Sequence, residues 1–339
     1  MVKLKDLAEK TGFSVTTISR ALGGYSDVNE VTRQHIIETA RELGYQPHEP
    51  ARQLRNQRTH TIGLIIPAND QSFSNDFFNM LLRGIGDAAS LQGYDVLISA
   101  HAPGHGEMQA YQRFVGGGRV DGMIIARTRQ ADERIQYLQQ MGHPFVVSGR
   151  GSPSEASDFA YIDADSQAGI RDATLHLIGL GHREIALLLP PPDLAYTEYR
   201  RRGYAEALTV AGIPYQPDYV LHGDLLRSGG YALTNGLLDT YPSITAVVCC
   251  NDLMALGAMS AAQKRGLTVG RDLSITGFDD IPPAEFAQPA LTTVRQPVYE
   301  IGQRLLQMLV RSITRKTAPE MQILLPTSLV VRESTGERR

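Results

Sequence analysis

An arginine-rich stretch near residue 50 contains the residue types that point most directly to a chemistry. In the eleven residues from position 48, HEPARQLRNQR, the run after Pro50 contains three arginines and no acid: Arg52, Arg55 and Arg58. Pro50 suits the first turn of a helix, and an acid-free basic cluster is typical of contact with nucleic-acid phosphates. Leu54 lies within this cluster. A helix of about two turns cannot bury that side chain against itself, so we expect Leu54 to pack on something else.

Elsewhere, side chains that catalyse reactions or bind metals do not occur at the spacings such chemistry needs. The glycine run Gly116–Arg119 precedes a strand-like segment instead of following one, which is the wrong order for a phosphate-binding loop. His101 and His105 have a proline and a glycine between them and no further ligand nearby, and His182 lies in a helix-to-strand turn. No GxSxG, HExxH or paired-carboxylate pattern is present. We therefore expect no catalytic residue, no metal site and no cofactor.

The composition is that of an ordinary globular protein. The chain has 339 residues, enough for two or three domains, with 42% hydrophobic and 20% charged residues. No window has the roughly 18 apolar residues of a membrane helix, and the first ten residues, MVKLKDLAEK, lack the apolar core of a secretion signal. The two cysteines, Cys249 and Cys250, are neighbours that would face opposite sides of a strand. These features predict a protein of the reducing cytoplasm, without a membrane partner.

The first 46 residues predict three short helices. Apolar residues recur at helical spacing in LKDLAEKTG, in VTTISRAL and in the stretch that ends with ARELG. Ser14 and Asn29 are placed to cap the second and third helices. In the second helix, Val15, Thr16 and Arg20 face away from the apolar stripe.

This pattern is typical of a helix-turn-helix, in which a tight turn joins two helices and the second presents small polar residues and an arginine. Residues 1–60 carry nine Lys or Arg against seven acids, in a chain of net charge −3. The asymmetry is mild but has the sign that DNA binding needs. Three-helix units also bind other proteins, so this stretch alone favours DNA binding and leaves a protein-binding role open.

From Thr59 onward, apolar β-rich runs alternate with helical patterns. The runs are TIGLIIP, YDVLIS, VDGMIIA, PFVVSG, YIDA, EIALLL, TAVVCC and LSITGF. Helices are expected between them, for example over residues 77–91, 166–180 and 196–210. Buried strands that alternate with helices form parallel sheets covered on both faces, and about eight such units exceed one typical sheet. We therefore expect two similar α/β lobes, with a ligand site in the cleft between them at the carboxyl ends of the strands.

Residue blocks along the whole chain resemble the LacI/GalR family of bacterial transcriptional regulators. In family order they are KLKDLAEKTGFSVTTISRAL, ELGYQP, ARQLR, TIGLIIP, VDGMII, GHREIALL, RRRGYAEAL, VVCCNDLMALGAM, DLSITGFDD, ALTTVRQP and LVVREST. The resemblance implies an α/β protein with an N-terminal three-helix helix-turn-helix DNA-binding domain over residues 1–46. A hinge helix and linker would follow over 47–58, and a two-lobed, periplasmic-binding-protein-like α/β effector domain over 59–339. Its N-lobe would comprise about 59–163 and 294–326, and its C-lobe about 164–293 and 327–339.

The resemblance also implies which residues contact DNA. The helix from Val15 to Leu22 would be the recognition helix, with Val15, Thr16 and Arg20 at base edges and with Ser14 and Thr17 near phosphates. The residue types suit this role, because arginine can donate two hydrogen bonds to guanine and the methyl groups of valine and threonine fit against that of thymine.

In the family, the hinge helices of a dimer insert a leucine into the minor groove at the centre of the operator. Leu54 occupies that position, with Arg52 and Arg55 beside it. Such a wedge costs a few kcal/mol of unstacking, which contact with the bent DNA can offset. Because so short a helix is not stable alone, we expect its folding to depend on DNA and on the distance at which the effector lobes hold the two hinges. The alternative is that Leu54 packs on its own domain.

Matching motifs indicate an effector site made of seven residues: Phe77, Phe78, Arg150, Tyr196, Arg200, Asn251 and Asp279. An arginine fork, a carboxylate and an amide together suit a polyhydroxyl ligand, and an aromatic face can stack on a sugar ring. Two alternatives stay open: either phenylalanine could belong to the core, and Asp279 could cap the loop after it. Leu225 stands where purine-binding relatives have an aromatic residue, which favours a sugar over a purine.

The resemblance therefore implies a cytoplasmic, homodimeric repressor of a carbohydrate-utilisation operon, released from a near-palindromic double-stranded operator by a sugar. The opposite sense, with a nucleobase or sugar phosphate as corepressor, stays open. A sugar-handling enzyme on the same two-lobed fold is a further alternative, but it would need a general acid and base converging in the cleft, and no pair is evident. A binding module without DNA would leave residues 1–58 unexplained. The tail ESTGERR has no heptads, so we expect a dimer.

Overall fold

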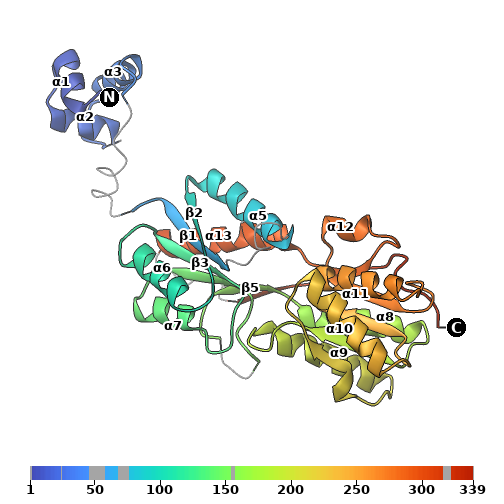
Figure 1. Ribbon diagram of the computed structural model, residues 1–339. Coiled ribbons are helices and arrows are strands. Elements are labelled where there is room, and N and C mark those ends of the chain that lie inside the picture. The colour runs from blue at the N-terminus through green and yellow to red at the C-terminus, as the bar shows by residue number, and fades with distance from the viewer. Residues whose placement is uncertain are drawn as a thin grey trace. The chain divides into compact units, whose positions relative to one another are not determined.

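The chain forms two compact units, Met1–Arg58 and Thr59–Arg339 (Figure 1). The computed structural model describes residues 2–23, 25–45, 58–67, 76–153, 157–315 and 322–338. The expected hinge residues Arg52, Leu54 and Arg55 lie outside the described residues.

Three helices build the first unit, and local sequence explains where they begin and end. They are α1 (Leu4–Thr11), α2 (Val15–Leu22) and α3 (Glu30–Glu42). Gly12 ends α1 in the left-handed conformation, at φ 74°. The Ser14 hydroxyl accepts a hydrogen bond from the backbone N–H of Thr17 at 3.0 Å, and the Asn29 side chain caps α3 in the same way. The tight turn between α1 and α2 therefore has the geometry of a helix-turn-helix.

One small hydrophobic core holds these helices together. Its buried members are Leu7, Ile18, Ala21, Val28, Ile36 and Ala40. Ile18 and Ala21 come from the inward face of α2, so the outward face of that helix does not take part in the packing.

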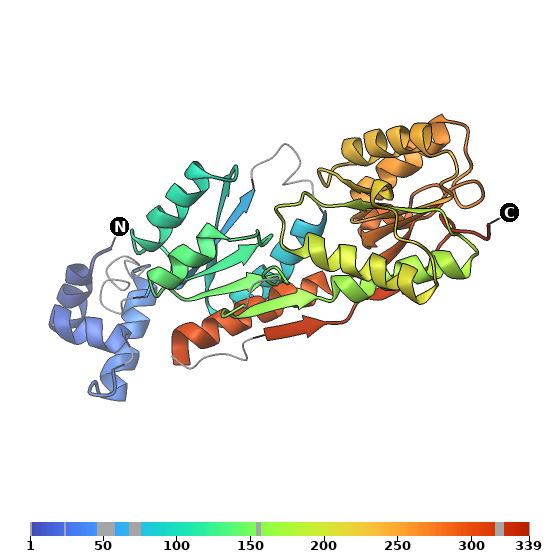
Figure 2. The ribbon, with the colours of Figure 1, turned by 90° about the horizontal axis from the view of Figure 1, so that it is seen from below.

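The second unit contains two six-stranded sheets, each covered by helices on both faces (Figure 2). The first sheet, with its helices, is called the N-lobe. Its strands, in spatial order, are β11 (Gln322–Leu325), β5 (Tyr161–Ala164), β4 (Phe145–Ser148), β3 (Gly122–Ala126), β1 (Thr61–Pro67) and β2 (Asp95–His101). All of them run parallel.

The N-lobe has a separate core on each face of its sheet. Its helices are α5 (Asp76–Gln92), α6 (His105–Val115), α7 (Glu133–Gln140) and α13 (Val298–Arg315). Leu64 packs with α5 and α13, and its neighbour Ile65 packs with α6 and α7 on the opposite face. This alternation explains why β1 is apolar at nearly every position.

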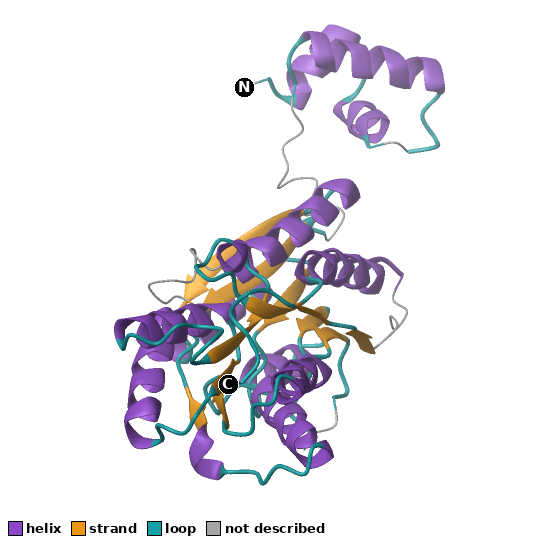
Figure 3. Ribbon diagram, turned by 90° about the vertical axis from the view of Figure 1, so that its right-hand side faces the viewer, coloured by secondary structure: helices purple, strands orange, loops and turns teal. Residues whose placement is uncertain are grey.

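The second sheet, with its helices, is called the C-lobe and repeats this plan. Its strands, in spatial order, are β12 (Ser328–Val330), β10 (Thr292–Arg295), β9 (Ser274–Asp279), β8 (Ala246–Cys249), β6 (Ile185–Leu189) and β7 (Val220–His222). Its helices are α8 (Ser166–Gly179), α9 (Tyr196–Val210), α10 (Arg227–Thr240), α11 (Asp252–Lys264) and the short α12 (Pro282–Glu285). All strands are parallel except β12, which pairs antiparallel with β10. Figure 3 shows the strands enclosed between helices.

The chain passes between the two lobes three times. It leaves the N-lobe sheet after β5, returns between β10 and α13, and leaves again between β11 and β12. The expected lobe boundary at residue 294 falls inside β10, because all four residues of that strand pair with β9 of the C-lobe.

His182 and the two cysteines take part in the packing of the C-lobe. The His182 ring is hydrogen-bonded to the Thr245 hydroxyl at 2.9 Å and to the Gly336 carbonyl at 3.0 Å. Cys249 and Cys250 are buried and unbridged. Over the described ranges, no cluster of three His, Cys, Asp or Glu side chains could hold a metal ion. None of the helices in this part of the chain has both the length and the apolar character that a membrane span requires.

Candidate functional site

The outward face of α2 is the candidate DNA-contacting surface. Val15, Thr16 and Arg20 are all exposed there, and the hydroxyls of Ser14 and Thr17 lie 2.8 Å apart at the start of the helix. The backbone N–H groups of Val15 and Thr16, at the helix N-terminus, have no acceptor within the helix and suit a phosphate. Val15, Thr16 and Arg20 are therefore exposed on α2, and Ser14 and Thr17 stand at its N-terminal end.

Arg20 is held in place before any ligand arrives. Its guanidinium forms an ion pair with Asp27 at 2.7 Å and lies over the Tyr25 ring at 5.7 Å. Both partners of the ion pair are about half exposed. Exposed ion pairs are worth less than about 1 kcal/mol, so a guanine edge can compete for the same guanidinium.

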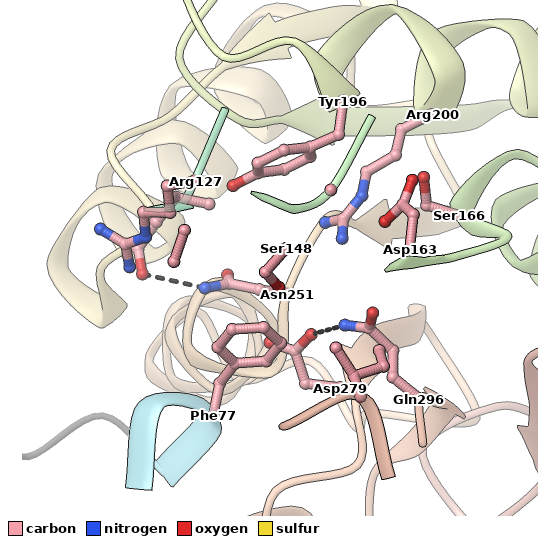
Figure 4. Close-up of a pocket in the computed structure, with 14 residues that line it drawn as sticks. Phe77, Arg127, Ser148, Asp163, Ser166, Tyr196, Arg200, Asn251, Asp279 and Gln296 are labelled. Carbon is pink, nitrogen blue, oxygen red and sulfur yellow. Dashed lines mark hydrogen bonds between the residues drawn. The ribbon is translucent and has the colours of Figure 1, made fainter. Parts of the chain in front are cut away.

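A pocket opens between the two lobes of the second unit (Figure 4). The space between the pocket walls, with its open mouth included, is about 750 Å³. Six polar residues of its wall stand at or next to the carboxyl ends of strands: Arg127, Ser148, Asp163, Asn251, Asp279 and Gln296. Because the carboxyl ends of parallel strands meet at one edge of a sheet, the fold gathers them from distant parts of the chain.

Arg200 is the central cation of the pocket. It is 6% exposed and lies between two aromatic rings, with its guanidinium carbon 4.7 Å from the Tyr196 ring centre and 4.1 Å from that of Phe278. One of its terminal nitrogens donates to the carbonyl oxygen of Cys250. Its Nε has no hydrogen-bond acceptor among the described residues. The stacked rings fix the guanidinium plane, so this donor is presented in one orientation.

Two carboxylates face the same space. Asp279 accepts a hydrogen bond from the Gln296 amide at 2.5 Å, and burial raises its pKa to about 6 against the opposing charge of Arg200. Its φ of 119° lies in the left-handed region, which costs a non-glycine residue energy and is typical of functional sites. Asp163 accepts from Arg150 Nε at 2.8 Å, and burial raises its pKa as well. Both side chains are therefore acceptors whose charge the protein stabilises only in part.

Asn251 and Tyr196 complete the polar wall. The Asn251 side chain caps α11 by accepting from Met254 N–H at 3.0 Å, and it donates to the Leu225 carbonyl at 3.0 Å. Burial raises the pKa of Tyr196 to about 12, so its hydroxyl keeps its proton at neutral pH. Phe77 supplies an aromatic face at the start of α5.

The structure brings five of the seven expected effector residues to the pocket: Phe77, Tyr196, Arg200, Asn251 and Asp279. Phe78 is instead 1% exposed in the core beneath α5, because consecutive residues of a helix point about 100° apart and only one can face the cleft. Arg150 does not line the pocket either. Its guanidinium stacks on the Tyr199 ring at 3.8 Å and pairs with Asp163, so it acts on the pocket only through that carboxylate.

Sequence reasoning missed five polar residues of the wall: Arg127, Ser148, Asp163, Ser166 and Gln296. The general signal for four of them was present, because each polar residue stands where a β-rich run ends. Only the sheet order shows that β3, β4, β5 and β10 present those ends to a single cleft. Leu225 also lines the pocket, so an aliphatic side chain forms the wall at that point.

A helix-turn-helix unit followed by a two-lobed ligand-binding unit defines the class of ligand-responsive DNA-binding regulators. The model of bacterial regulatory proteins of the lacI family matches residues 3–48, and that of a periplasmic binding protein-like domain matches residues 174–335. The HTH-type transcriptional regulator CelR of Thermobifida fusca is 35% identical over 98% of this chain and 97% of its own.

Solved structures agree with the sequence matches. A complex described as transcriptional regulator CelR with cellobiose superposes with a TM-score of 0.78 and 32% identity, covering 98% of this chain and 100% of that one. A structure of the lac repressor dimer bound to operator and the anti-inducer ONPF superposes with a TM-score of 0.86 and 29% identity, covering 99% of both chains. The chain belongs to the LacI family, and it is a DNA-binding transcriptional regulator and not an enzyme.

Proposed function

We propose that this regulator is a cytoplasmic homodimeric repressor that binds a near-palindromic operator and is released by an uncharged sugar in the interlobe pocket. The genes under its control would serve carbohydrate utilisation. One observation carries the ligand class: two buried polar atoms of the wall, Arg200 Nε and Ser166 Oγ, have no hydrogen-bond partner in the described part of the chain. A buried polar atom left without a partner costs about 1–3 kcal/mol. A ligand rich in hydroxyls recovers that energy.

The rest of the wall matches the same ligand. Arg127 and Arg200 occur beside Asp163 and Asp279, so the pocket does not have the single sign of charge that selects an ionic ligand. Hydroxyls can accept from the arginines and donate to the carboxylates. The faces of Phe77 and Tyr196 suit the C–H surface of a sugar ring. The aliphatic Leu225 gives no stacking surface for a purine.

The dimer and the operator geometry rest on similarity and on the first unit. The lac repressor structure that superposes over nearly the whole chain is a dimer on its operator. A two-fold symmetric dimer presents two recognition helices, which requires a near-palindromic site. The expected hinge with Arg52, Leu54 and Arg55 would bind the centre of that site.

The proposed release depends on different sugar affinities of two lobe arrangements. A sugar with equal affinity for both arrangements shifts neither. To change the ratio of the two arrangements from 1:99 to 99:1, the sugar must bind one arrangement about 10⁴-fold more tightly than the other. The three passages of chain between the lobes are the places where such a rearrangement would turn.

The test combines operator selection with sugar titration. High-affinity duplexes are selected from a random library with the full-length protein, and binding to the best duplex is followed by fluorescence anisotropy while glucose, maltose, cellobiose, trehalose or sucrose is added. We expect at least one sugar to weaken operator binding. Arg200→Met should keep operator affinity and lose the sugar response. Arg202→Met is the matched control, because Arg202 is an exposed arginine of the same helix, paired with Glu198 at 3.0 Å.

The results separate the alternatives. If a sugar strengthens operator binding, the protein is a corepressor-dependent regulator and the proposed sense is wrong. If no sugar changes operator binding, or if Arg202→Met abolishes the response as fully as Arg200→Met, the proposed role of the pocket is refuted.

A further inference from the structure

Six of the polar residues that line the pocket form two facing rows of three. Arg127, Ser148 and Asp163 stand at the ends of β3, β4 and β5, which are consecutive in the N-lobe sheet. Asn251, Asp279 and Gln296 stand at the ends of β8, β9 and β10, which are consecutive in the C-lobe sheet. Figure 4 shows both rows running in the same direction, from Arg127 and Asn251 at the left to Asp163 and Gln296 at the right.

The strand spacing sets the length of these rows. Neighbouring strands lie about 4.8 Å apart, so three consecutive strand ends span roughly 10 Å. Asp163 and Arg127 stand on β5 and after β3, with β4 between them, so a ring bound at one end of the row lies roughly 10 Å from the other end. One sugar ring that is held by Arg200 and Asp163 therefore leaves the Arg127 end of the rows unfilled.

The backbone at Arg127 is held rigidly although its φ of 54° is unusual for a non-glycine residue. Its carbonyl accepts from the buried Arg134 at 2.8 Å, and Arg134 is itself fixed by ion pairs to Asp132 and Glu107. On the other side, the Thr128 carbonyl accepts from the Ala195 N–H of the C-lobe at 3.0 Å. A strained backbone that is held from both lobes indicates that the position of this side chain matters.

The Arg127 guanidinium itself has donors to spare. It lies over the Phe78 ring at 4.8 Å. It makes no hydrogen bond or ion pair with any residue that the structure describes, while the other pocket arginine, Arg200, donates to Cys250. The stacking fixes its plane without using its N–H groups, so they can be donated to a ligand at that end of the rows.

We infer that the pocket takes a saccharide of at least two rings, and that Arg127 binds the second ring and so determines specificity for a disaccharide over a monosaccharide. This inference rests on the proposed function. The first ring lies against Arg200, Asp163 and Ser166, where the unpartnered polar atoms are. The second ring lies between Arg127 and Asn251, near the aromatic face of Phe77.

The experiment compares one-ring and two-ring ligands by calorimetric titration of the full-length protein with glucose, maltose, cellobiose and trehalose. We expect one disaccharide to bind at least tenfold more tightly than glucose. Arg127→Met keeps the aliphatic stem and removes the donors, so it should weaken binding of that disaccharide by about ten- to a hundredfold and weaken binding of glucose far less. Arg127→Lys keeps the charge but not the forked pair of donors, so its affinity for the disaccharide should lie between that of the unchanged protein and that of Arg127→Met.

The matched control is Arg119→Met. Arg119 is also an N-lobe arginine stacked on a phenylalanine, Phe114, at 5.5 Å, but it is exposed and does not line the pocket. This variant should bind both sugars like the unchanged protein. Thermal unfolding of each variant checks that the fold is intact.

Three results would overturn the inference. Glucose could bind as tightly as every disaccharide. Alternatively, Arg127→Met could weaken the binding of glucose and of the disaccharide equally, or could weaken the binding of neither. Absence of binding by any of these sugars would instead refute the proposed function. The two failures can therefore be distinguished.

Discussion

The substitution Asp279→Asn should make the protein more stable and less able to bind its ligand. Asparagine keeps the shape of the side chain and an oxygen that can accept from Gln296, but it cannot become charged. Burial raises the pKa of Asp279 to about 6 from an ordinary value of 3.8. A rise of this size corresponds to roughly 3 kcal/mol between the protonated and charged forms. Because the side chain is only half-buried and faces the water of the cleft, we expect a gain of about 2 kcal/mol at neutral pH.

The sign of the pH dependence follows from the raised pKa. Below about pH 4 the carboxyl is protonated in both the folded and the unfolded chain, so it costs no stability. Between about pH 4 and pH 6 the unfolded chain loses its proton first, and the charged carboxylate is then fully penalised in the folded state above pH 6. The gain from Asp279→Asn should therefore be near zero at pH 4 and grow to its full value by pH 7.

The assay is urea unfolding of the sugar-free protein, followed by circular dichroism at several pH values and one protein concentration, since dimerisation affects apparent stability. Asp239→Asn is the matched control, because Asp239 is an exposed acid of the C-lobe paired with Arg265 at 2.5 Å. It should give no gain that grows with pH. Titration should also show sugar affinity reduced about tenfold or more by Asp279→Asn. A variant no more stable than the parent at pH 7, or equally stabilised at pH 4, would show that the reasoning on burial is wrong.

The other predictions concern DNA binding and packing. Arg20→Ala should weaken operator binding by about 1–3 kcal/mol, and an unchanged preference for operator over random DNA in anisotropy titrations would exclude base recognition. Leu54→Ala, outside the described residues, should keep sugar affinity but reduce DNA bending measured by energy transfer; an unaltered bend angle counts against the wedge. Gly203→Ala would place a Cβ 2.1 Å from the Gln167 carbonyl oxygen and should cost at least 1–3 kcal/mol of unfolding free energy. Gly236→Ala meets nothing within 4 Å and should instead stabilise by about 0.4–1 kcal/mol, so equal effects of both glycine variants in urea would contradict the packing argument.

The sequence by itself determined the elements whose causes are local. The second helix of the first unit was expected over residues 15–22 and is observed there, because Ser14 caps it and its apolar stripe has a single inward face. The helix expected over 196–210 is likewise observed within those bounds. Apolar β-rich runs indicated parallel sheets because a strand buried on both faces leaves a continuous hydrophobic signal. The helix-turn-helix and the two lobes could be predicted for this reason.

Only the tertiary structure decided which side chains meet. Phe77 and Phe78 are chemically alike, and the direction in which α5 docks sends one to the cleft and the other to the core. Arg150 and Arg127 both follow N-lobe strands. The Arg150 guanidinium pairs with Asp163 and stacks on Tyr199, and these contacts hold it away from the pocket wall. The Arg127 guanidinium lines the pocket and makes no hydrogen bond with a described residue. A linear pattern does not contain the order of strands in a sheet, and the pocket depends on that order because neighbouring strand ends, not neighbouring residues, line it.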